Sequence, residues 1–254
     1  MGNLELIKTS KMKKSIKTIL SLIIFFSLSL GHSQSLINKK VVGNGNITTK
    51  TLSTADYDII KGVGFMDIHL EKGTEGNIAV TTDDNLHEYI EIKVKNKVLI
   101  VKTKKNINLK TKKGIHITVP FEDISKVTLT GSGDINTKDI IMANEFNASV
   151  VGSGDIILTV KASKVEVVVS GSGDVTLSGS TSNLVVGVRG SGDFRGFDLN
   201  SQNTNVSVSG SGDAKVVAKE KLIARVSGSG DIIYKGNPAK RDVKTSGSGD
   251  ISSY

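Results

Sequence analysis

The tetrapeptide Gly-Ser-Gly-Asp occurs seven times in the second half of this chain of 254 residues. Successive copies start 21, 19, 19, 20, 18 and 19 residues apart. A fixed period of about 20 residues is typical of a solenoid, in which each repeat is one supersecondary unit stacked on the last. The copies begin at Gly131, Gly152, Gly171, Gly190, Gly210, Gly228 and Gly247.

Apolar and polar residues alternate on both sides of each tetrapeptide. Before the fifth copy, Val206 and Val208 flank Ser207, and after it Ala214 and Val216 flank a lysine. A period of two is the pattern of a β-strand and not of a helix. Each repeat therefore predicts two strands, joined by the glycine-rich corner and by a variable polar corner. No helical stretch fits between copies, so we predict an all-β fold, a single-stranded parallel β-helix with coils of about 20 residues.

The glycines of the repeat have a structural purpose. A coil this short must turn sharply, and only glycine adopts a positive φ at little cost. Because the corner recurs once per coil, the corners should stack in columns with a rung spacing of about 4.8 Å. The inward columns would then stack valine on valine and isoleucine on isoleucine, which suits β-branched side chains.

The first 33 residues have the features of a secretory signal peptide. Lysines precede an apolar run at residues 19–26, and the small residues Gly31 and Ser33 precede a cleavage site at Gln34. The alternative is a transmembrane anchor, but the run is shorter than the roughly 20 residues that a span needs. We predict cleavage, no integral membrane span in the mature chain, and export to the periplasm, the outer surface or the extracellular space.

Composition narrows the class of protein further. The chain has no cysteine, which excludes disulfides and an anchor on a lipidated cysteine. The whole chain carries a net charge of +8, with 33 basic and 25 acidic residues. The segment up to Ser33 holds five lysines and one glutamate, so the mature chain has 28 basic and 24 acidic residues, or +4. This balance is too mild to indicate nucleic acid as a partner.

Residues 34–125 precede the repeats and are also strand-like. Alternation is clear at residues 66–70, 90–94 and 115–119, with turn residues between these segments. A solenoid needs a capping element where its first rung would otherwise be bare. We expect residues 34–125 to cap or start the solenoid and residues 126–254 to form the β-helix of Gly-Ser-Gly-Asp repeats.

Several motifs, in order along the mature chain, carry a family resemblance. They are Val42–Ile47, Phe65–Gly73, Asp83–Leu86, Ile117–Pro120, the Gly-Ser-Gly-Asp series and Tyr234–Pro238. In these the chain resembles the head-GIN-domain putative auto-transporter adhesins, exported proteins common in Bacteroidetes. The resemblance implies a right-handed β-helix in the cell envelope. We expect a non-catalytic exported protein that acts as an adhesin-like binding or structural module. The resemblance brings no catalytic residues with it.

One aspartate per coil forms a second column. Three interpretations compete: each carboxylate accepts N–H groups within its own turn, the column binds Ca²⁺, or neighbouring carboxylates form a glycosidase pair. Calcium takes six to eight oxygen ligands, and one carboxylate per coil supplies few of them. A catalytic pair needs two different environments, whereas these are alike. We favour the turn and expect no catalytic residue, cofactor or metal site; the alternatives are a polysaccharide-processing enzyme on a β-helix scaffold and a Ca-binding repeat protein. The column comprises Asp134, Asp155, Asp174, Asp193, Asp213, Asp231 and Asp250.

Lysine is concentrated just before the repeats. Residues 92–121 contain nine lysines and no aspartate or glutamate. The spacing by two places several of them on one face of a strand. They form either a solvated face that protects a sheet edge or an anion-binding patch. A partner would then be a glycan, an envelope polymer or a surface protein. The candidate patch consists of Lys93, Lys95, Lys97, Lys102, Lys104, Lys110 and Lys112.

Overall fold

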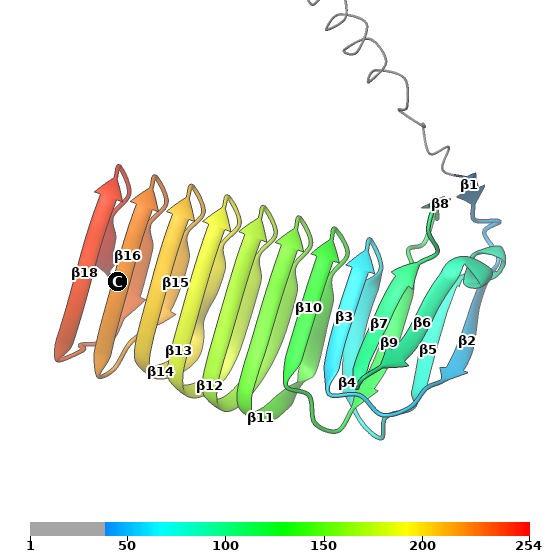
Figure 1. Cartoon of the computed structure of the whole chain (residues 1–254), viewed down its shortest axis with the longest axis horizontal. Helices are drawn as coiled ribbons and strands as arrows, with labels where there is room; N and C mark the ends of the chain where they lie inside the picture. The colour runs from blue at the N-terminus through cyan, green and yellow to red at the C-terminus, as the bar shows by residue number, and fades with distance from the viewer. Residues whose placement is uncertain (1–38) are drawn as a thin grey trace, which may run out of the picture. The chain divides into compact units, whose positions relative to one another are not determined.

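The computed structural model describes residues 39–254, which form one compact unit. The predicted signal peptide, residues 1–33, lies outside the described residues. The unit is a parallel β-solenoid of about seven turns with coils of about 19 residues. This confirms the predicted all-β solenoid (Figure 1). No helix within residues 39–254 has the length and apolar character that a membrane crossing requires.

The elements follow one another with short connections. In chain order they are β1 (Lys39–Val42), β2 (Ile47–Ser53), β3 (Ile59–Gly64), β4 (Asp67–Lys72), β5 (Asn77–Asp83), the 3-10 helix η1 (Asp84–Tyr89), β6 (Ile90–Lys95), β7 (Val98–Thr103), β8 (Ile107–Lys110), β9 (His116–Phe121), β10 (Lys126–Gly131), β11 (Ile135–Gly152), β12 (Ile156–Gly171), β13 (Val175–Gly190), β14 (Phe194–Gly210), β15 (Ala214–Val217), β16 (Lys221–Gly228), β17 (Ile232–Lys235), β18 (Lys240–Gly247) and β19 (Ile251–Ser253).

The coils stack in parallel and in register. The first glycine of each tetrapeptide lies opposite the first glycine of the next, as Gly152 lies opposite Gly171. The predicted polar corner differs from expectation in the first coils. In β11 to β14 it is a bend within one continuous strand of 16 to 18 residues, because the ladder resumes within a residue or two of the bend. The later coils divide there, as between β15 and β16, and so does the earlier coil between β9 and β10.

Both glycines of the tetrapeptide are required by the close approach of neighbouring coils. The first has a φ between 115° and 136° in all seven copies. Its carbonyl oxygen accepts two N–H groups from the next coil; Gly152 accepts from Ser172 at 2.8 Å and from Gly173 at 3.0 Å. A Cβ on Gly173 would lie 2.1 Å from the carbonyl oxygen of Gly154. The serine between the glycines is exposed, so it is the position that tolerates change.

The aspartate column is a ladder between coils. The backbone N–H of each aspartate donates to Oδ1 of the aspartate one coil earlier, at 2.8 to 3.0 Å for the six pairs from Asp134 to Asp250. The predicted turn role is therefore corrected in one respect, since the bond runs to the next coil rather than within the same turn. Neighbouring carboxylates in this column repel by about 0.9 kcal/mol at 4.8 Å in bulk water. Each N–H group placed against a carboxylate offsets part of this repulsion.

One arginine neutralises the middle of this column. The Arg195 guanidinium lies 2.6 Å from Oδ2 of Asp174 and 3.1 Å from Oδ2 of Asp193. Partial burial opposes the charged form of Arg195, but the hydrogen bond to Asp174 and the neighbouring carboxylates outweigh it and raise the pKa of Arg195. The side chain therefore remains a permanent cation across two rungs.

The ladder begins one coil earlier than the repeats in the sequence. Gly64 has a φ of 117°, and its carbonyl oxygen accepts N–H groups from Ser132 and Gly133 at 2.8 and 3.1 Å. The N–H of Asp134 donates to Oδ1 of Asp67 at 3.2 Å. Residues 64–67 thus form a divergent first corner that keeps only the first glycine and the aspartate. The second glycine is replaced by Met66, which is buried in the core.

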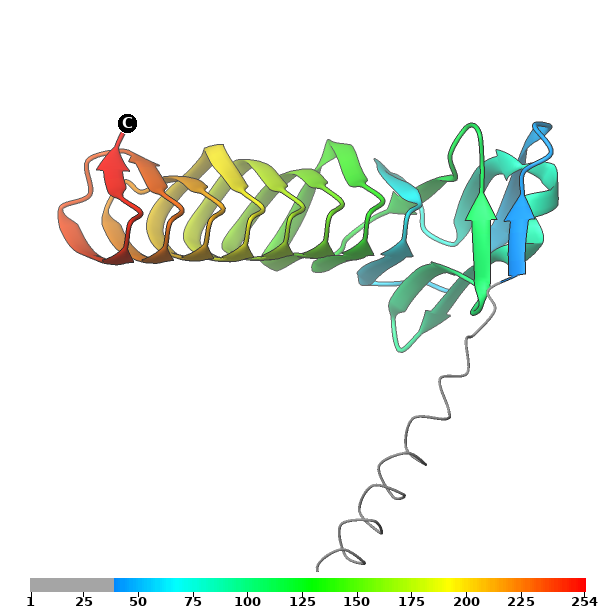
Figure 2. The ribbon, with the colours of Figure 1, turned by 90° about the horizontal axis from the view of Figure 1, so that it is seen from above.

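The rungs at the N-terminal end are not in sequence order. Strand β3 pairs with β10 on one side and β7 on the other, and β4 pairs likewise with β11 and β9. Residues 98–121 therefore lie beyond residues 59–72 in the stack although they come later in the chain. Strands β2, β5 and β6 follow at that end and pair antiparallel (Figures 1 and 2).

Two of the motifs noted in the sequence meet in this region. The side chain of Asp83 is fully buried and accepts the N–H of Gly45 at 2.6 Å and the hydroxyl of Thr111 at 2.7 Å. A Cβ on Gly43 would lie 2.3 Å from the Asp83 carboxyl carbon. The buried carboxylate therefore fastens the Gly-Asn-Gly-Asn segment to the end of β5, and glycine is required at position 43 for this contact.

The glycine corner makes a direct prediction. Gly173→Ala should lower the free energy of unfolding by about 1–3 kcal/mol, the usual range for an overpacked site. Ser172→Ala is the matched control and should change it by less than about 0.5 kcal/mol, because this side chain is exposed. Equal losses in urea or thermal unfolding of the two variants would contradict the close-approach account.

The hydrogen bonds of the buried Asp83 carboxylate predict that the stability of the fold depends on pH. The Thr111 hydroxyl, helped by the Gly45 N–H and opposed by burial, lowers the pKa of Asp83. A lowered folded-state pKa means that the stabilisation is complete above the unfolded value of about 3.9 and is lost as the pH falls through the folded value. Asp83→Asn should therefore melt at a lower temperature than the wild type at pH 7. The difference should narrow below about pH 4; a gap that is constant from pH 7 to pH 3 would argue against a charged Asp83.

Candidate functional site: a polar groove along the bend

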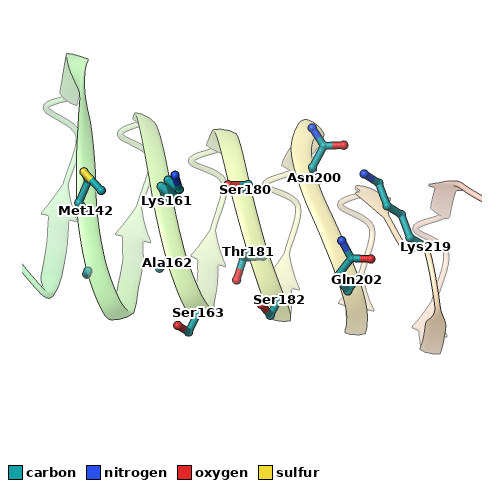
Figure 3. A pocket seen from close by; sticks show the side chains of 11 residues that line it. Met142, Lys161, Ala162, Ser163, Ser180, Thr181, Ser182, Asn200, Gln202 and Lys219 are labelled. Atoms are coloured by element: carbon teal, nitrogen blue, oxygen red, sulfur yellow. The ribbon is translucent and has the colours of Figure 1, made fainter.

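A groove runs along the bend of the coils, on the side away from the glycine corners. Its central part has a volume of about 830 Å³ and draws side chains from four successive rungs and the connection that follows (Figure 3). The lining residues are Met142, Ala143, Lys161, Ala162, Ser163, Ser180, Thr181, Ser182, Asn200, Gln202 and Lys219.

The register of the strands arranges these side chains in rows along the solenoid axis. Met142 lies opposite Lys161, which lies opposite Ser180, which lies opposite Asn200. Successive members of the row are one rung, about 4.8 Å, apart. Figure 3 shows this row, with Lys219 at the far end. A ligand that follows the row would meet a new polar group at every rung after Met142.

Hydroxyl groups on the inner side of the bend fix its shape. The buried Thr181 hydroxyl donates to the carbonyl oxygen of Asn183 at 3.1 Å, and one coil later the buried Ser201 hydroxyl donates to that of Asn203 at 2.9 Å. Each bond spans two residues across the bend, where the ladder skips one residue. The floor of the groove is therefore held by hydrogen bonds that do not depend on a ligand.

The groove continues at both ends. A depression of about 530 Å³ shares Met142 and Ala143 with the central part, and another of about 390 Å³ shares Lys219. Together they extend from the bend before β10 to the bend before β18. Six rung steps give a length of about 29 Å.

The chemistry of the lining differs along this length. The central part offers hydroxyls, amides and two lysines, and none of its lining residues is Asp, Glu or His. Carboxylates occur at the two ends of the groove. Near β10, Asp58 accepts the N–H and hydroxyl of Ser125 at 3.1 and 2.6 Å and Glu145 lies 3.5 Å from Lys164; near β18, the lining includes Glu220. The centre can therefore bind a polar chain by hydrogen bonds but holds no carboxylate pair for glycoside hydrolysis.

The structure divides the predicted lysine patch between two sheets. Lys93 and Lys95 lie on β6, which pairs antiparallel with β7, the strand of Lys102. Lys110 lies on β8, which pairs with β1 in a separate two-stranded sheet. Lys97 lies in the turn between β6 and β7, Lys104 follows β7, and Lys112 follows β8.

Glu91, which lies one residue before the lysine-rich stretch, contacts two of its lysines. Glu91 contacts Lys93 and lies 3.5 Å from Lys102, so two of the seven lysines are already paired. The hydrogen bond to Lys93, which outweighs burial, lowers the pKa of Glu91 and keeps it charged. Lys95 and Lys97 are exposed and make no ion pair among residues 39–254.

A histidine pair was not predicted from the sequence. His69 and His116 stack with ring centroids 5.5 Å apart, and Nε2 of His69 lies 3.2 Å from Nδ1 of His116. Nδ1 of His116 lies 3.7 Å from Asp67. The two histidines are 47 residues apart and meet because β9 is stacked beside β4 out of sequence order. Among residues 39–254, no group of three or more His, Cys, Asp or Glu side chains has a geometry that could hold a metal ion.

The irregular coil at β14 has one inward and one outward aromatic residue. Phe194 is fully buried, as the period of two predicts. Phe197 contacts Lys235, whose Nζ lies 4.2 Å from the ring centroid, and it packs edge-on against Tyr254 at 5.2 Å. This outward cluster lies where β14 gains one residue relative to β13.

Solved structures with the same fold come from Bacteroides and Parabacteroides species. A putative adhesin from Bacteroides fragilis is 22% identical, with a TM-score of 0.80 over 84% of this chain and 100% of that one. A putative lipid binding protein from Parabacteroides distasonis is 26% identical, with a TM-score of 0.72 over 85% of this chain and 100% of that one. A putative adhesin from Parabacteroides merdae is 23% identical, with a TM-score of 0.69 over 85% and 99%.

A family model matches most of the solenoid. The comparison with curated proteins found no match. The model described as "Putative auto-transporter adhesin, head GIN domain" matches residues 56–238, which include the divergent first corner and six of the seven tetrapeptides. The chain therefore belongs to the head-GIN-domain family of putative auto-transporter adhesins.

Proposed function

We propose that this protein is an exported, non-catalytic, adhesin-like module of the cell envelope that binds an extended glycan along the groove at the bend. The observation that carries the proposal is the groove itself. It crosses the rungs of a rigid ladder and presents Lys161, Ser180 and Asn200 in a row, one rung or about 4.8 Å apart, with further hydroxyl and amide groups among the lining residues. Membership of an adhesin-like family supports the same class of function.

The physical argument for a glycan rests on preorganisation. Binding a flexible polymer costs conformational entropy, and a site that needs no ordering of its own leaves more free energy for affinity. The groove floor is fixed by Thr181 and Ser201, and every lining strand belongs to the ladder. A polymer with hydroxyls along its length can exchange its bonds to water for bonds to these groups. Lys161 and Lys219 favour a glycan that carries some negative charge.

The location follows from the same family and from the predicted signal peptide at residues 1–33. An exported binding module has access to glycans, envelope polymers and surface proteins. Nothing in the mild positive charge of the mature sequence favours nucleic acid over these partners.

The rival function is an enzyme that cleaves the glycan instead of retaining it. A pair of catalytic carboxylates would have to come from the end of the groove near β10, where Asp123 and Glu145 lie, because the lining at the other end includes a single carboxylate, Glu220. A test that measures both binding and the release of reducing ends separates the two functions. Release of reducing ends by the wild type that is lost in Asp123→Asn would replace the binding proposal by the enzymatic one.

The groove makes a prediction about its amides. Asn200→Leu/Gln202→Leu keeps the approximate size of both side chains and removes their hydrogen bonds. Two lost bonds of about 0.5–1.5 kcal/mol each should weaken the affinity for a bound polysaccharide by roughly tenfold. Calorimetry with a polysaccharide selected from an array measures the change. Asn205→Leu, exposed on the other side of the bend, is the control and should bind like the wild type; equal affinities for all three proteins would exclude this groove.

Anion binding at the lysines is a second candidate, favoured by the exposure of Lys95 and Lys97 and by the absence of ion pairs to them within residues 39–254. Contacts of this kind are screened over about 8–10 Å at physiological salt, so heparin should bind more weakly as salt rises.

The expected result distinguishes the two kinds of lysine. Lys95→Gln/Lys97→Gln should reduce heparin retention, whereas Lys93→Gln should reduce it less, because Lys93 is already paired with Glu91. Salt elution from a heparin column gives the comparison. If all variants are retained equally, the lysines do not bind anions, and their role is to protect the sheet edge.

A further inference from the structure

The last coil presents an open strand edge. All eight residues of β18 are exposed, and within residues 39–254 this strand pairs only with β16. Val243 is 50% exposed although its neighbour in the same inward column, Ala224, is fully buried. An open edge with unpaired backbone groups is a template for another strand. The C-terminal end of the stack thus combines a strand edge that has no partner on its outer side with exposed apolar surface at Val243.

The other end of the solenoid cannot supply a parallel rung to this edge. Strand β7 is paired on both sides, with β3 and β6, and β9 is paired on both sides, with β4 and β5. Neither β7 nor β9 can therefore take up a further parallel strand; β2 and β6 each keep one unpaired edge within residues 39–254, but β6 runs antiparallel to β7 and so does not continue the parallel ladder of β18. An arrangement that pairs β18 with its own copy brings two C-terminal ends together around a two-fold axis, which is a closed assembly with antiparallel strands.

The sequence of β18 fits this arrangement in one register. Residues directly opposite in an antiparallel pair lie on the same face of the sheet. With Val243 on the two-fold axis, Asp242 of each copy lies opposite Lys244 of the other, and Arg241 lies opposite Thr245. Moving the axis by one residue places Asp242 opposite Asp242, or Lys244 opposite Lys244. Like charges directly opposite are destabilising, so the pattern selects the register centred on Val243.

We propose that two copies of this chain associate through β18, as an antiparallel pair centred on Val243 with two Asp242–Lys244 contacts between copies. Asp242 and Lys244 both point outward, since they lie opposite Ile223 and Arg225 and alternate with the inward Val243. Oδ2 of Asp242 contacts Arg225 of its own chain at 2.5 Å, and Oδ1 has no hydrogen bond among the described residues.

Charge exchange tests the proposal with the full chain. Analytical ultracentrifugation of the wild type should show a monomer–dimer equilibrium that shifts with concentration. Asp242→Lys and Lys244→Asp should each weaken self-association at least tenfold, because each places like charges opposite one another twice. An equimolar mixture of these two variants should associate again, since every lysine then faces an aspartate. The double variant Asp242→Lys/Lys244→Asp should also associate.

The controls separate this contact from general effects of charge. Lys240→Asp changes the net charge as much as Lys244→Asp does, but position 240 lies opposite Ser246 in the proposed register and should leave association unchanged. Unchanged melting temperatures show that the variants fold. A wild type that stays monomeric at all concentrations, or a mixture that associates no more than its two components, would overturn the proposal.

Discussion

Neighbouring coils approach so closely at the glycine corner that a carbonyl oxygen in one coil accepts two N–H groups from the next. This contact sets the rest of the solenoid. It requires a positive φ at the first glycine and the absence of a Cβ at both, and it aligns each corner above the last. Once the corners are aligned, the side chains on either side lie in columns. Valine then stacks on valine because the register of the corners fixes which residues lie opposite each other. The side chain of the serine between the glycines takes no part, which is why the divergent corner at Gly64 can have Phe65 in its place.

The aspartate column gives the stack a direction. Each carboxylate accepts an N–H from the coil that follows, so every coil uses an acceptor on its N-terminal side and offers one on its C-terminal side. A row of carboxylates one rung apart would by itself oppose stacking. The N–H dipoles between them, and Arg195 across Asp174 and Asp193, offset this repulsion. Oδ1 of the first six aspartates is thus engaged in holding the coils together, and Oδ2 of Asp174 and Asp193 is engaged by Arg195.

The features that recur in every coil could be predicted from the sequence, whereas the features that occur once could not. The period, the strands and the inward position of Phe194 and Val208 follow from a pattern of two and from the properties of glycine. The first corner at Gly64 was missed because it keeps only two of four residues, and the stacking of residues 98–121 beyond residues 59–72 was missed because long-range pairing leaves no local signal. The direction of the aspartate bond depends on the spacing between coils. The groove was not predicted because its residues differ from coil to coil and become a row only through the register.

This contrast bears on where function can lie in such a fold. Both glycines are under the same geometric demand in all seven tetrapeptides, so they are not free to vary without loss of stability. The bend is held mainly by inward hydroxyls such as Thr181 and Ser201, and its outward positions are occupied by methionine, lysine, serine and asparagine in successive coils. Substitutions are therefore expected to change the stability little on the outer side of the bend and to lower it at the glycine corner. A binding surface can therefore be altered one rung at a time along the bend while the corners keep the rungs in register.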